Sequence, residues 1–206
     1  MEKGFYLKEH FRSNAWIYFA LIVVFIAGLG WGLISPNGMD TKNSGEMESY
    51  VSDLVAALPS ADIDNIQEAK AFFSFNGLLM LGLWICGITV IGIPLLIPIL
   101  FYKGYTLGFS IGLIMKLAPS KGIVLTLLTI IPANLLLIPV LLVGGVLAVR
   151  FSLNLLRGKR DDSRSLGKAF GLYCVYFLIL GAILAVAALI HGYVGVTLLQ
   201  LFFNII

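Results

Sequence analysis

The pentapeptide from Gly108 to Gly112, GFSIG, has the G-x-S-x-G pattern that surrounds the nucleophile of serine hydrolases. In those enzymes the serine lies on a strained turn from a strand to a helix, and it needs a histidine base and an acid. Here the pentapeptide lies in an apolar run, no acid lies in any expected membrane span, and His10 and His191 are the only histidines. We therefore expect no catalytic role for Ser110, whose hydroxyl should instead bond a backbone carbonyl one turn earlier.

The sequence also contains no motif that indicates a metal site or a nucleotide site. The two cysteines and two histidines are far apart and show none of the spacings that signal zinc, and no HExxH is present. The phosphate-binding patterns GxxxxGKS/T and GxGxxG after a strand are missing as well. We therefore predict a chain that is not an enzyme, that holds no metal or cofactor, and that does not hydrolyse ATP itself.

Charged groups within a bilayer are energetically costly and are therefore candidates for a transport function. The expected spans contain no acid, and Lys103 is the nearest candidate for a buried charge. A lysine at the end of a helix commonly extends its head group to the interface, so we expect Lys103 to lie there. For His191 we likewise favour an interfacial position over a role as a proton relay.

Composition identifies an integral membrane protein, because 59% of the 206 residues are hydrophobic and only 12% are charged. Seven of the eleven acids lie in 40–68, whereas basic residues gather in 150–168. Since cytoplasmic loops carry the excess of Lys and Arg, we expect 150–168 and the basic N-terminus, 1–14, to lie inside. The residues expected to act as cytoplasmic topology anchors are Arg157, Lys159, Arg160 and Arg164. The net charge of +3 does not indicate a nucleic-acid partner.

The first apolar run is expected to be a membrane anchor over 15–35, since it is about 20 residues long and lacks a clear small-x-small cleavage site. After it, an acidic external segment over 36–73 is predicted to hold two helices. The first is amphipathic, over about 47–58, and the second begins near Asp64, whose side chain can cap it with Gln67 three residues on. The apolar stripe of this segment suits either a lid on the membrane surface or a surface that docks a partner.

A broken or re-entrant membrane core is expected over 74–149. As one helix, its first 44 residues would be about 66 Å long, twice a bilayer core of about 30 Å, so the chain must turn back. The expected helix breaks are Gly92, Pro94 and Pro98. The charge of Lys103 is expected to mark the reversal, which leaves 104–117 as a re-entrant or half-length helix of about 21 Å.

Glycines recur at every fourth position after the expected reversal. These glycines, Gly104, Gly108 and Gly112, form a stripe that lets another helix come close, whether in a partner or in a homodimer. A long span over 123–149 is expected to be kinked, because Pro132, Asn134 and Pro139 lie inside it. The last span is expected over 169–191, and the C-terminal piece, 192–206, against the outer interface. The predicted fold is therefore all-α and polytopic, with about five transmembrane helices, a broken or re-entrant segment and an external amphipathic helical segment.

The order of these segments resembles the stage II sporulation protein M family. The resemblance covers essentially the whole chain and rests chiefly on the GIP of residues 92–94 and the KGYTLGFSIG of residues 103–112. It implies a non-catalytic protein of the mother-cell membrane, which acts at the septum while the mother cell engulfs the forespore. The implied partners are stage II sporulation proteins D and P, two peptidoglycan-remodelling hydrolases that the protein would hold and position.

A transport function is the alternative, in which the chain is the membrane subunit of a system driven by a separate ATPase. Broken helices favour this hypothesis, because interrupted spans commonly build binding sites at the membrane midplane. It also requires a cytoplasmic coupling surface, for which 150–168 is the candidate. That loop is short, and the positive-inside rule favours a role as a topology anchor. Membrane lipid is an expected partner under either hypothesis.

Overall fold

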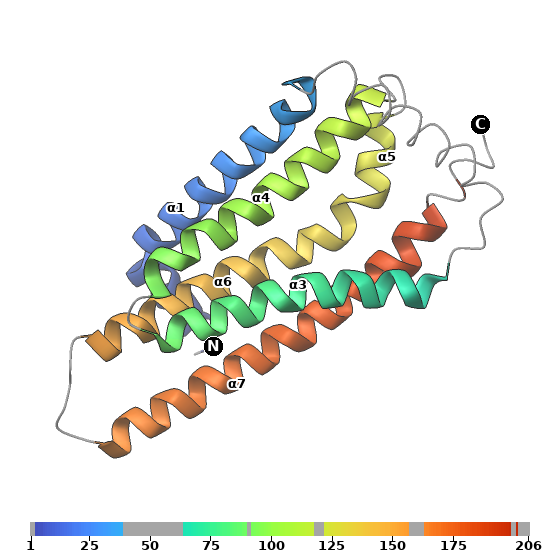
Figure 1. The fold of residues 1–206 in the computed structure, drawn as a ribbon. Coiled ribbons are helices and arrows are strands. Elements are labelled where there is room, and N and C mark those ends of the chain that lie inside the picture. The colour runs from blue at the N-terminus through green and yellow to red at the C-terminus, as the bar shows by residue number, and fades with distance from the viewer. Residues whose placement is uncertain are drawn as a thin grey trace.

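The structure is a computed structural model that describes residues 3–38, 64–89, 92–117, 122–156, 163–198 and 201. Within these ranges every element is a helix, and Figure 1 shows them as a bundle. Five stretches of the described residues are long and apolar enough to cross a membrane, which confirms the predicted all-α fold with five spans. The elements are α1 (Lys3–Ile34), the 3-10 turn η1 (Ser35–Gly38), α3 (Asn65–Ile88), α4 (Gly92–Leu117), α5 (Gly122–Thr129), α6 (Ile131–Leu156), α7 (Ser163–Leu189) and the π-helical turn η3 (Ile190–Gly195).

Helix α6 lies at the centre of the bundle. It contacts α1, α3, α4, α5, α7 and η3, and 56% of its apolar stretch is buried, against 28 to 33% in the other four spans. The fully buried core side chains on it and around it are aliphatic and include Leu83, Leu96, Leu137 and Leu184. The remaining helices therefore pack around α6 and turn their outer faces away from the protein.

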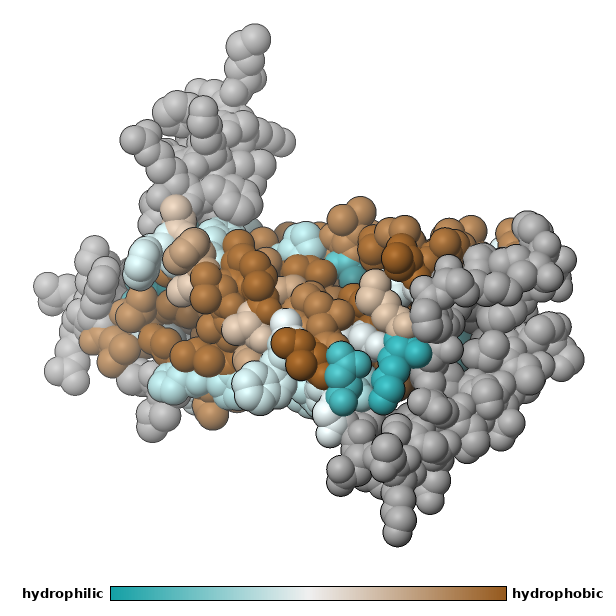
Figure 2. All heavy atoms as spheres, turned by 90° about the horizontal axis from the view of Figure 1, so that it is seen from above, coloured by the Kyte–Doolittle hydropathy of each residue, from teal (hydrophilic) through white to brown (hydrophobic). Residues whose placement is uncertain are grey.

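Large apolar side chains cover the outside of the bundle. Trp16 is 78% exposed, Leu178 74% and Leu135 70%, and Figure 2 shows hydrophobic residues spread over much of the described surface in that view. Monomeric soluble proteins rarely expose apolar patches of this extent. The arrangement is that of helices whose outer faces meet lipid.

Helix α3 begins as the sequence predicted. Asp64 caps it, and its Oδ1 accepts hydrogen bonds from the backbone N–H groups of Ile66, at 2.8 Å, and Gln67, at 3.3 Å. The helix then continues without a break to Ile88, so its first turns belong to the membrane span. The amphipathic helix expected over 47–58 lies outside the described residues.

The reversal after α3 is not where the sequence predicted it. Helix α3 ends at Ile88 and α4 begins at Gly92, so the chain turns between these residues, and the reversal predicted at Lys103 is wrong. A Cβ at Gly92 would overlap the backbone of Cys86, so glycine permits the close approach that this turn requires. Pro94 lies in the first turn of α4, where its missing N–H breaks no helical hydrogen bond.

Helix α4 is a full-length span. Its 26 residues are about 39 Å long and pass through Pro98 without ending, so 104–117 is the second half of a crossing and is not a separate re-entrant helix. Proline is tolerated inside a membrane helix when neighbouring helices satisfy the freed backbone groups. In this case α1 packs along α4 over much of its length.

The broken segment lies further along the chain, at Ile130 between α5 and α6. The kink predicted for 123–149 is confirmed there, directly before Pro132, whereas Pro139 lies inside α6 without ending it. A second irregularity follows in the last span. Helix α7 passes into the π-helical turn η3, and residues 192–198 continue the last span as helix instead of forming the expected interfacial piece. Most of the remaining residues of that piece lie outside the described part of the chain.

Candidate functional site

A buried lysine and asparagine form the centre of the candidate site. Lys103 on α4 is 6% exposed and Asn76 on α3 is 1% exposed, and Nζ of Lys103 donates a hydrogen bond of 2.9 Å to Oδ1 of Asn76. The Asn76 amide in turn donates from Nδ2 to the backbone carbonyl of Phe72, at 2.8 Å. This amide group is therefore held in the orientation that presents its oxygen to the lysine.

The expectation that Lys103 extends to the interface is wrong. Lys103 lies eleven residues after Gly92, the first residue of α4, which places it about 16 Å along that helix. At this depth the side chain turns inward and finds Asn76, because a buried ammonium needs polar partners. Sequence reasoning missed this pair, although an isolated amide in an apolar run is a signal for such a partner.

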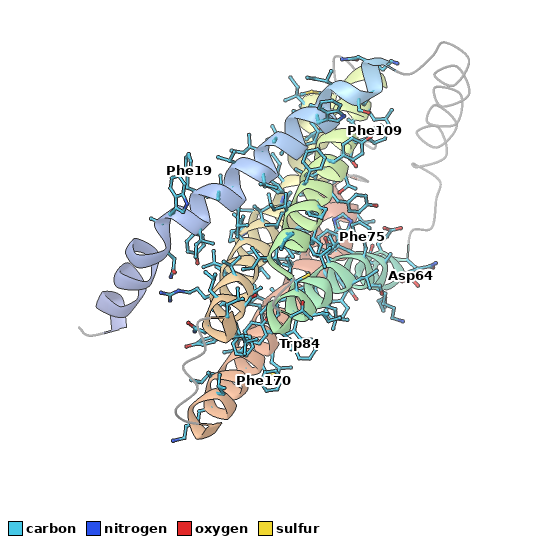
Figure 3. All side chains as sticks on the ribbon, turned by 60° about the vertical axis from the view of Figure 1, so that its left-hand side comes forward. Phe19, Asp64, Phe75, Trp84, Phe109 and Phe170 are labelled. Carbon is cyan, nitrogen blue, oxygen red and sulfur yellow. The ribbon has the colours of Figure 1, made fainter. Side chains whose placement is uncertain are left out.

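Aromatic rings surround the lysine head group. Nζ of Lys103 lies 5.9 Å from the ring centroid of Phe72 and 5.8 Å from that of Phe75, distances at which a ring face attracts a cation. His191 of η3 stacks on the same Phe72, with ring centroids 4.4 Å apart. Figure 3 shows where Phe75 lies on α3. Phe72 therefore contacts both the lysine and the histidine, and the half-buried His191 packs against α3.

The two irregular elements carry further buried polar groups. Asn134, one turn into α6, donates from Nδ2 to the carbonyl of Ile130 at the break, and Ile130 donates its own N–H to the carbonyl of Thr126. Three buried atoms have no hydrogen-bond partner among the described residues: Oγ1 of Thr126, Oδ1 of Asn134 and Nδ1 of His191. We call Asn76, Lys103, Thr126, Asn134 and His191 the interior polar cluster.

The glycine stripe of α4 packs against α1 of the same chain. A Cβ at Gly104, Gly108 or Gly112 would overlap the backbone of α1 at Phe25, Leu29 and Leu33 respectively. The relation is reciprocal, because Gly28 and Gly32 of α1 meet the carbonyls of Phe101 and Tyr105 on α4. Two parallel helices are thus interlocked at small residues. Helix α1 of the same chain therefore occupies the stripe and leaves no room there for a helix of another molecule.

Ser110 behaves as the sequence predicted. Its hydroxyl donates a hydrogen bond of 2.9 Å to the backbone carbonyl of Thr106, one turn earlier, and the residue is exposed on the outside of α4. Within the described ranges no group of three or more His, Cys, Asp or Glu side chains is placed to hold a metal ion. Cys86 and Cys174 are free thiols.

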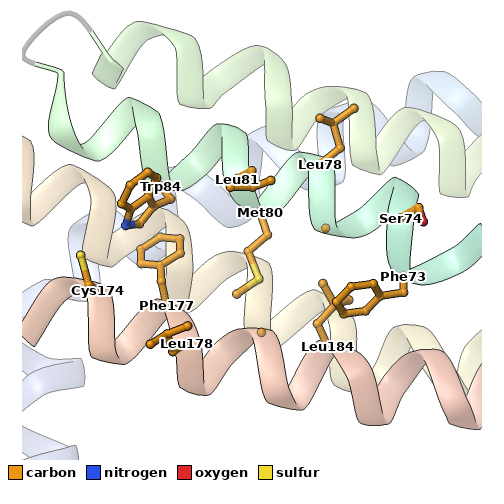
Figure 4. Close-up of a pocket in the computed structure, with 12 residues that line it drawn as sticks. Phe73, Ser74, Leu78, Met80, Leu81, Trp84, Cys174, Phe177, Leu178 and Leu184 are labelled. Atoms are coloured by element: carbon orange, nitrogen blue, oxygen red, sulfur yellow. The ribbon is translucent and has the colours of Figure 1, made fainter. Parts of the chain in front are cut away.

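An apolar groove of about 600 Å³ lies between α3 and α7 (Figure 4). Met80 and Phe177 reach into it, and Trp84 and Cys174 lie at one end. Two glycines lie along it, Gly77 on α3 and Gly181 on α7, and a Cβ added at either would meet no atom within 4 Å. Unlike the stripe on α4, these glycines therefore face open space.

The basic residues expected to anchor the topology fall largely outside the described part of the chain. Arg157, Lys159 and Arg160 lie outside it, and Arg164 lies in the first turn of α7. At the opposite end of the bundle Lys116 donates a hydrogen bond of 3.0 Å to the carbonyl of Pro36, which ties the end of α4 to η1.

Comparison with protein families gives a match over residues 21–195, to the family described as Stage II sporulation protein M. The chain belongs to the stage II sporulation protein M family. The matched region begins inside α1 and ends at Gly195, so it includes the whole interior polar cluster. The resemblance seen in GIP and KGYTLGFSIG is thereby confirmed, and the chain is a membrane protein of a sporulation-related family. Comparisons with curated proteins and with solved structures found no match.

Proposed function

We propose that this protein is a non-catalytic membrane scaffold that binds and positions peptidoglycan-remodelling hydrolases during bacterial endospore formation. The proposed partners are stage II sporulation proteins D and P, and the proposed place is the mother-cell membrane at the septum. Membership of the stage II sporulation protein M family supports a sporulation-related role. The hydroxyl of Ser110, the one residue in a nucleophile-like motif, is bonded to its own helix, which favours binding over catalysis.

The proposed topology places the N-terminus and the basic segment between α6, which ends at Leu156, and α7 in the cytoplasm, and the C-terminus outside. Five crossings agree with this arrangement, because an odd number puts the two ends of the chain on opposite sides. Both segments assigned to the cytoplasm are rich in Lys and Arg, and the segment between α1 and α3 carries most of the acids. The segment between α1 and α3 then faces the compartment in which the cell wall is remodelled.

The observation that best supports partner binding is the groove between α3 and α7. Its lining is almost wholly apolar, and Gly77 and Gly181 leave space along it in which a helix of a membrane-anchored partner can pack closely. The glycine stripe of α4, in contrast, is already occupied by α1. We therefore assign the membrane contact of the scaffold to the α3/α7 groove.

The test is recovery of partners from native sporulating membranes. The tagged protein is purified in mild detergent, and co-purifying proteins are quantified by mass spectrometry for the unchanged chain, Gly181→Leu and Gly30→Leu. Gly30 on α1 is the matched control, since a Cβ there also meets no atom within 4 Å, but it lies outside the groove. We expect the two hydrolases with the unchanged chain and with Gly30→Leu, and at least a fivefold loss with Gly181→Leu. Absence of the hydrolases from the unchanged chain would contradict the scaffold.

A transport subunit is the second candidate, and the buried Lys103 favours it. An ionisable residue inside a membrane bundle commonly marks a transport pathway, and the break between α5 and α6 resembles the interrupted helices of transporters. The same purification separates the two functions. Recovery of a cytoplasmic ATPase without cell-wall hydrolases would support transport and count against the scaffold.

A further inference from the structure

We infer that the interior polar cluster is hydrated, and that its water enters from the end of the bundle at which α3 begins. This binding site for water is independent of the scaffold function. It rests on three features of the described structure: buried polar atoms without a hydrogen-bond partner, two polar atoms that lie close to Gly195, and an aliphatic layer on one side.

The polar atoms of the cluster need partners that the described residues do not supply. Oγ1 of Thr126, Oδ1 of Asn134 and Nδ1 of His191 come from three different elements, and each is buried without a hydrogen bond to a described residue. The bond to Asn76 uses only one of the three N–H donors of Lys103. Such groups are costly to leave unpaired in a membrane interior, and buried water is their usual partner.

Two polar atoms lie close to Gly195, which is buried at the end of η3. A Cβ added there would have as its nearest neighbours the backbone oxygen of Thr129, at 3.5 Å, and Nδ1 of His191, at 3.9 Å. Both distances are ordinary van der Waals contacts, so the bare backbone of Gly195 brings two polar atoms from different elements within 4 Å of one point. A buried water needs two to four such polar partners.

Among the described residues, buried aliphatic side chains lie on one side of the cluster, and the first turns of α3 lie on the other. On the side toward Ile88 the cluster is followed by aliphatic side chains with 0 or 1% exposure, namely Leu83, Leu100, Leu137 and Leu184. On the other side Gly192, next to His191, packs against the backbone of Asn65 and Ala69 in the first turns of α3. The histidine thus lies close to the end of the bundle, and the lysine lies deeper. Water that reaches Lys103 from this end stabilises its charged form in the middle of the membrane.

Cysteine accessibility in proteoliposomes tests the inference. In a chain with Cys86→Ala and Cys174→Ala, single cysteines are introduced as Thr126→Cys in the cluster, Leu137→Cys in the dry layer and Leu178→Cys on the lipid-facing surface. A small charged methanethiosulfonate reagent reacts with the thiolate and therefore needs water at the site. We expect Thr126→Cys to be labelled at least tenfold faster than the two controls. Equal labelling rates of Thr126→Cys and Leu137→Cys would overturn the inference.

A second variant tests it without labelling. Thr126→Val keeps the shape of the side chain and removes the hydroxyl. If water bonds the hydroxyl, the substitution removes a satisfied hydrogen bond, and the melting temperature in detergent should be equal to or below that of the unchanged protein. If the hydroxyl is dry and unpaired, its removal relieves a desolvation cost and the melting temperature should rise. A rise would therefore overturn the inference.

Discussion

The hydrogen bond from Lys103 to Asn76 joins two consecutive helices at the same depth. Asn76 lies twelve residues before Ile88, where α3 ends, and Lys103 lies eleven residues after Gly92, where α4 begins. The two side chains meet because the helices are antiparallel and the turn between them is short. The position of that turn thus decides that the lysine is buried, and a reversal at Lys103 itself would have placed the charge at the membrane surface.

Removing the Asn76 amide alone should lower the stability of the protein more than removing both Asn76 and Lys103. We expect Asn76→Leu to lower the free energy of unfolding by about 3 kcal/mol, because it leaves the buried lysine without its oxygen partner. The double variant with Lys103→Met should regain a large part of this loss, since it leaves no buried charge. Unfolding in detergent of the two single variants and the double variant gives the coupling energy. Additive effects of the two substitutions would contradict a direct interaction between the side chains.

The interlock of α1 and α4 predicts a steric effect at the glycine stripe. Gly108→Leu places a side chain against the backbone of Leu29 and should destabilise the protein by about 3 kcal/mol or more, since backbone gives way less readily than a side chain. Gly30→Leu is the control, because no atom lies within 4 Å of a Cβ there. Thermal stability of the purified variants is measured by size-exclusion chromatography after heating. Equal stability of both variants would show that α1 and α4 do not pack through this stripe.

Loss of the Asp64 cap of α3 should destabilise the protein less than Gly108→Leu does. Asp64→Ala removes the acceptor of two backbone N–H groups and should cost about 1 kcal/mol, whereas Asp64→Asn keeps an acceptor and should cost less. The difference is measured by thermal unfolding, together with hydrogen exchange of the amides of Ile66 and Gln67. Faster exchange in the alanine variant alone is the expected result, and unchanged exchange in that variant would argue against the cap.

The corrected position of the reversal is open to a direct test in a cysteine-free chain. Thr89 is exposed just after α3, whereas Tyr102 is 48% exposed in the middle of α4, facing lipid. We therefore expect Thr89→Cys to react with a water-borne thiol reagent applied to opened membrane vesicles, and Tyr102→Cys to stay unmodified until the protein is unfolded. The opposite pattern would restore a reversal near Lys103.

Several features of this protein follow from local sequence. The apolar composition and the lengths of the runs determine five membrane helices, since a bilayer requires each span to satisfy its own backbone. The Asp64 cap and the kink before Pro132 are also local, because each depends on hydrogen bonds within about one turn. The bond from Ser110 to Thr106 spans four residues and was predicted for the same reason.

Other features were decided only by tertiary structure. In the almost wholly apolar run from Ser74 to Leu117, the break expected at Gly92 and Pro94 coincides with the turn, whereas Lys103, the expected mark of the reversal, lies inside α4. The depth of Lys103 depends on a partner 27 residues away, and the glycine stripe is filled by a helix about 80 residues earlier in the chain. In a membrane these choices depend on which helix faces fit together, because hydrophobicity is nearly the same on every side of an apolar helix. Hydropathy therefore determined that the chain crosses the membrane, and close packing determined what each buried polar or small residue meets there.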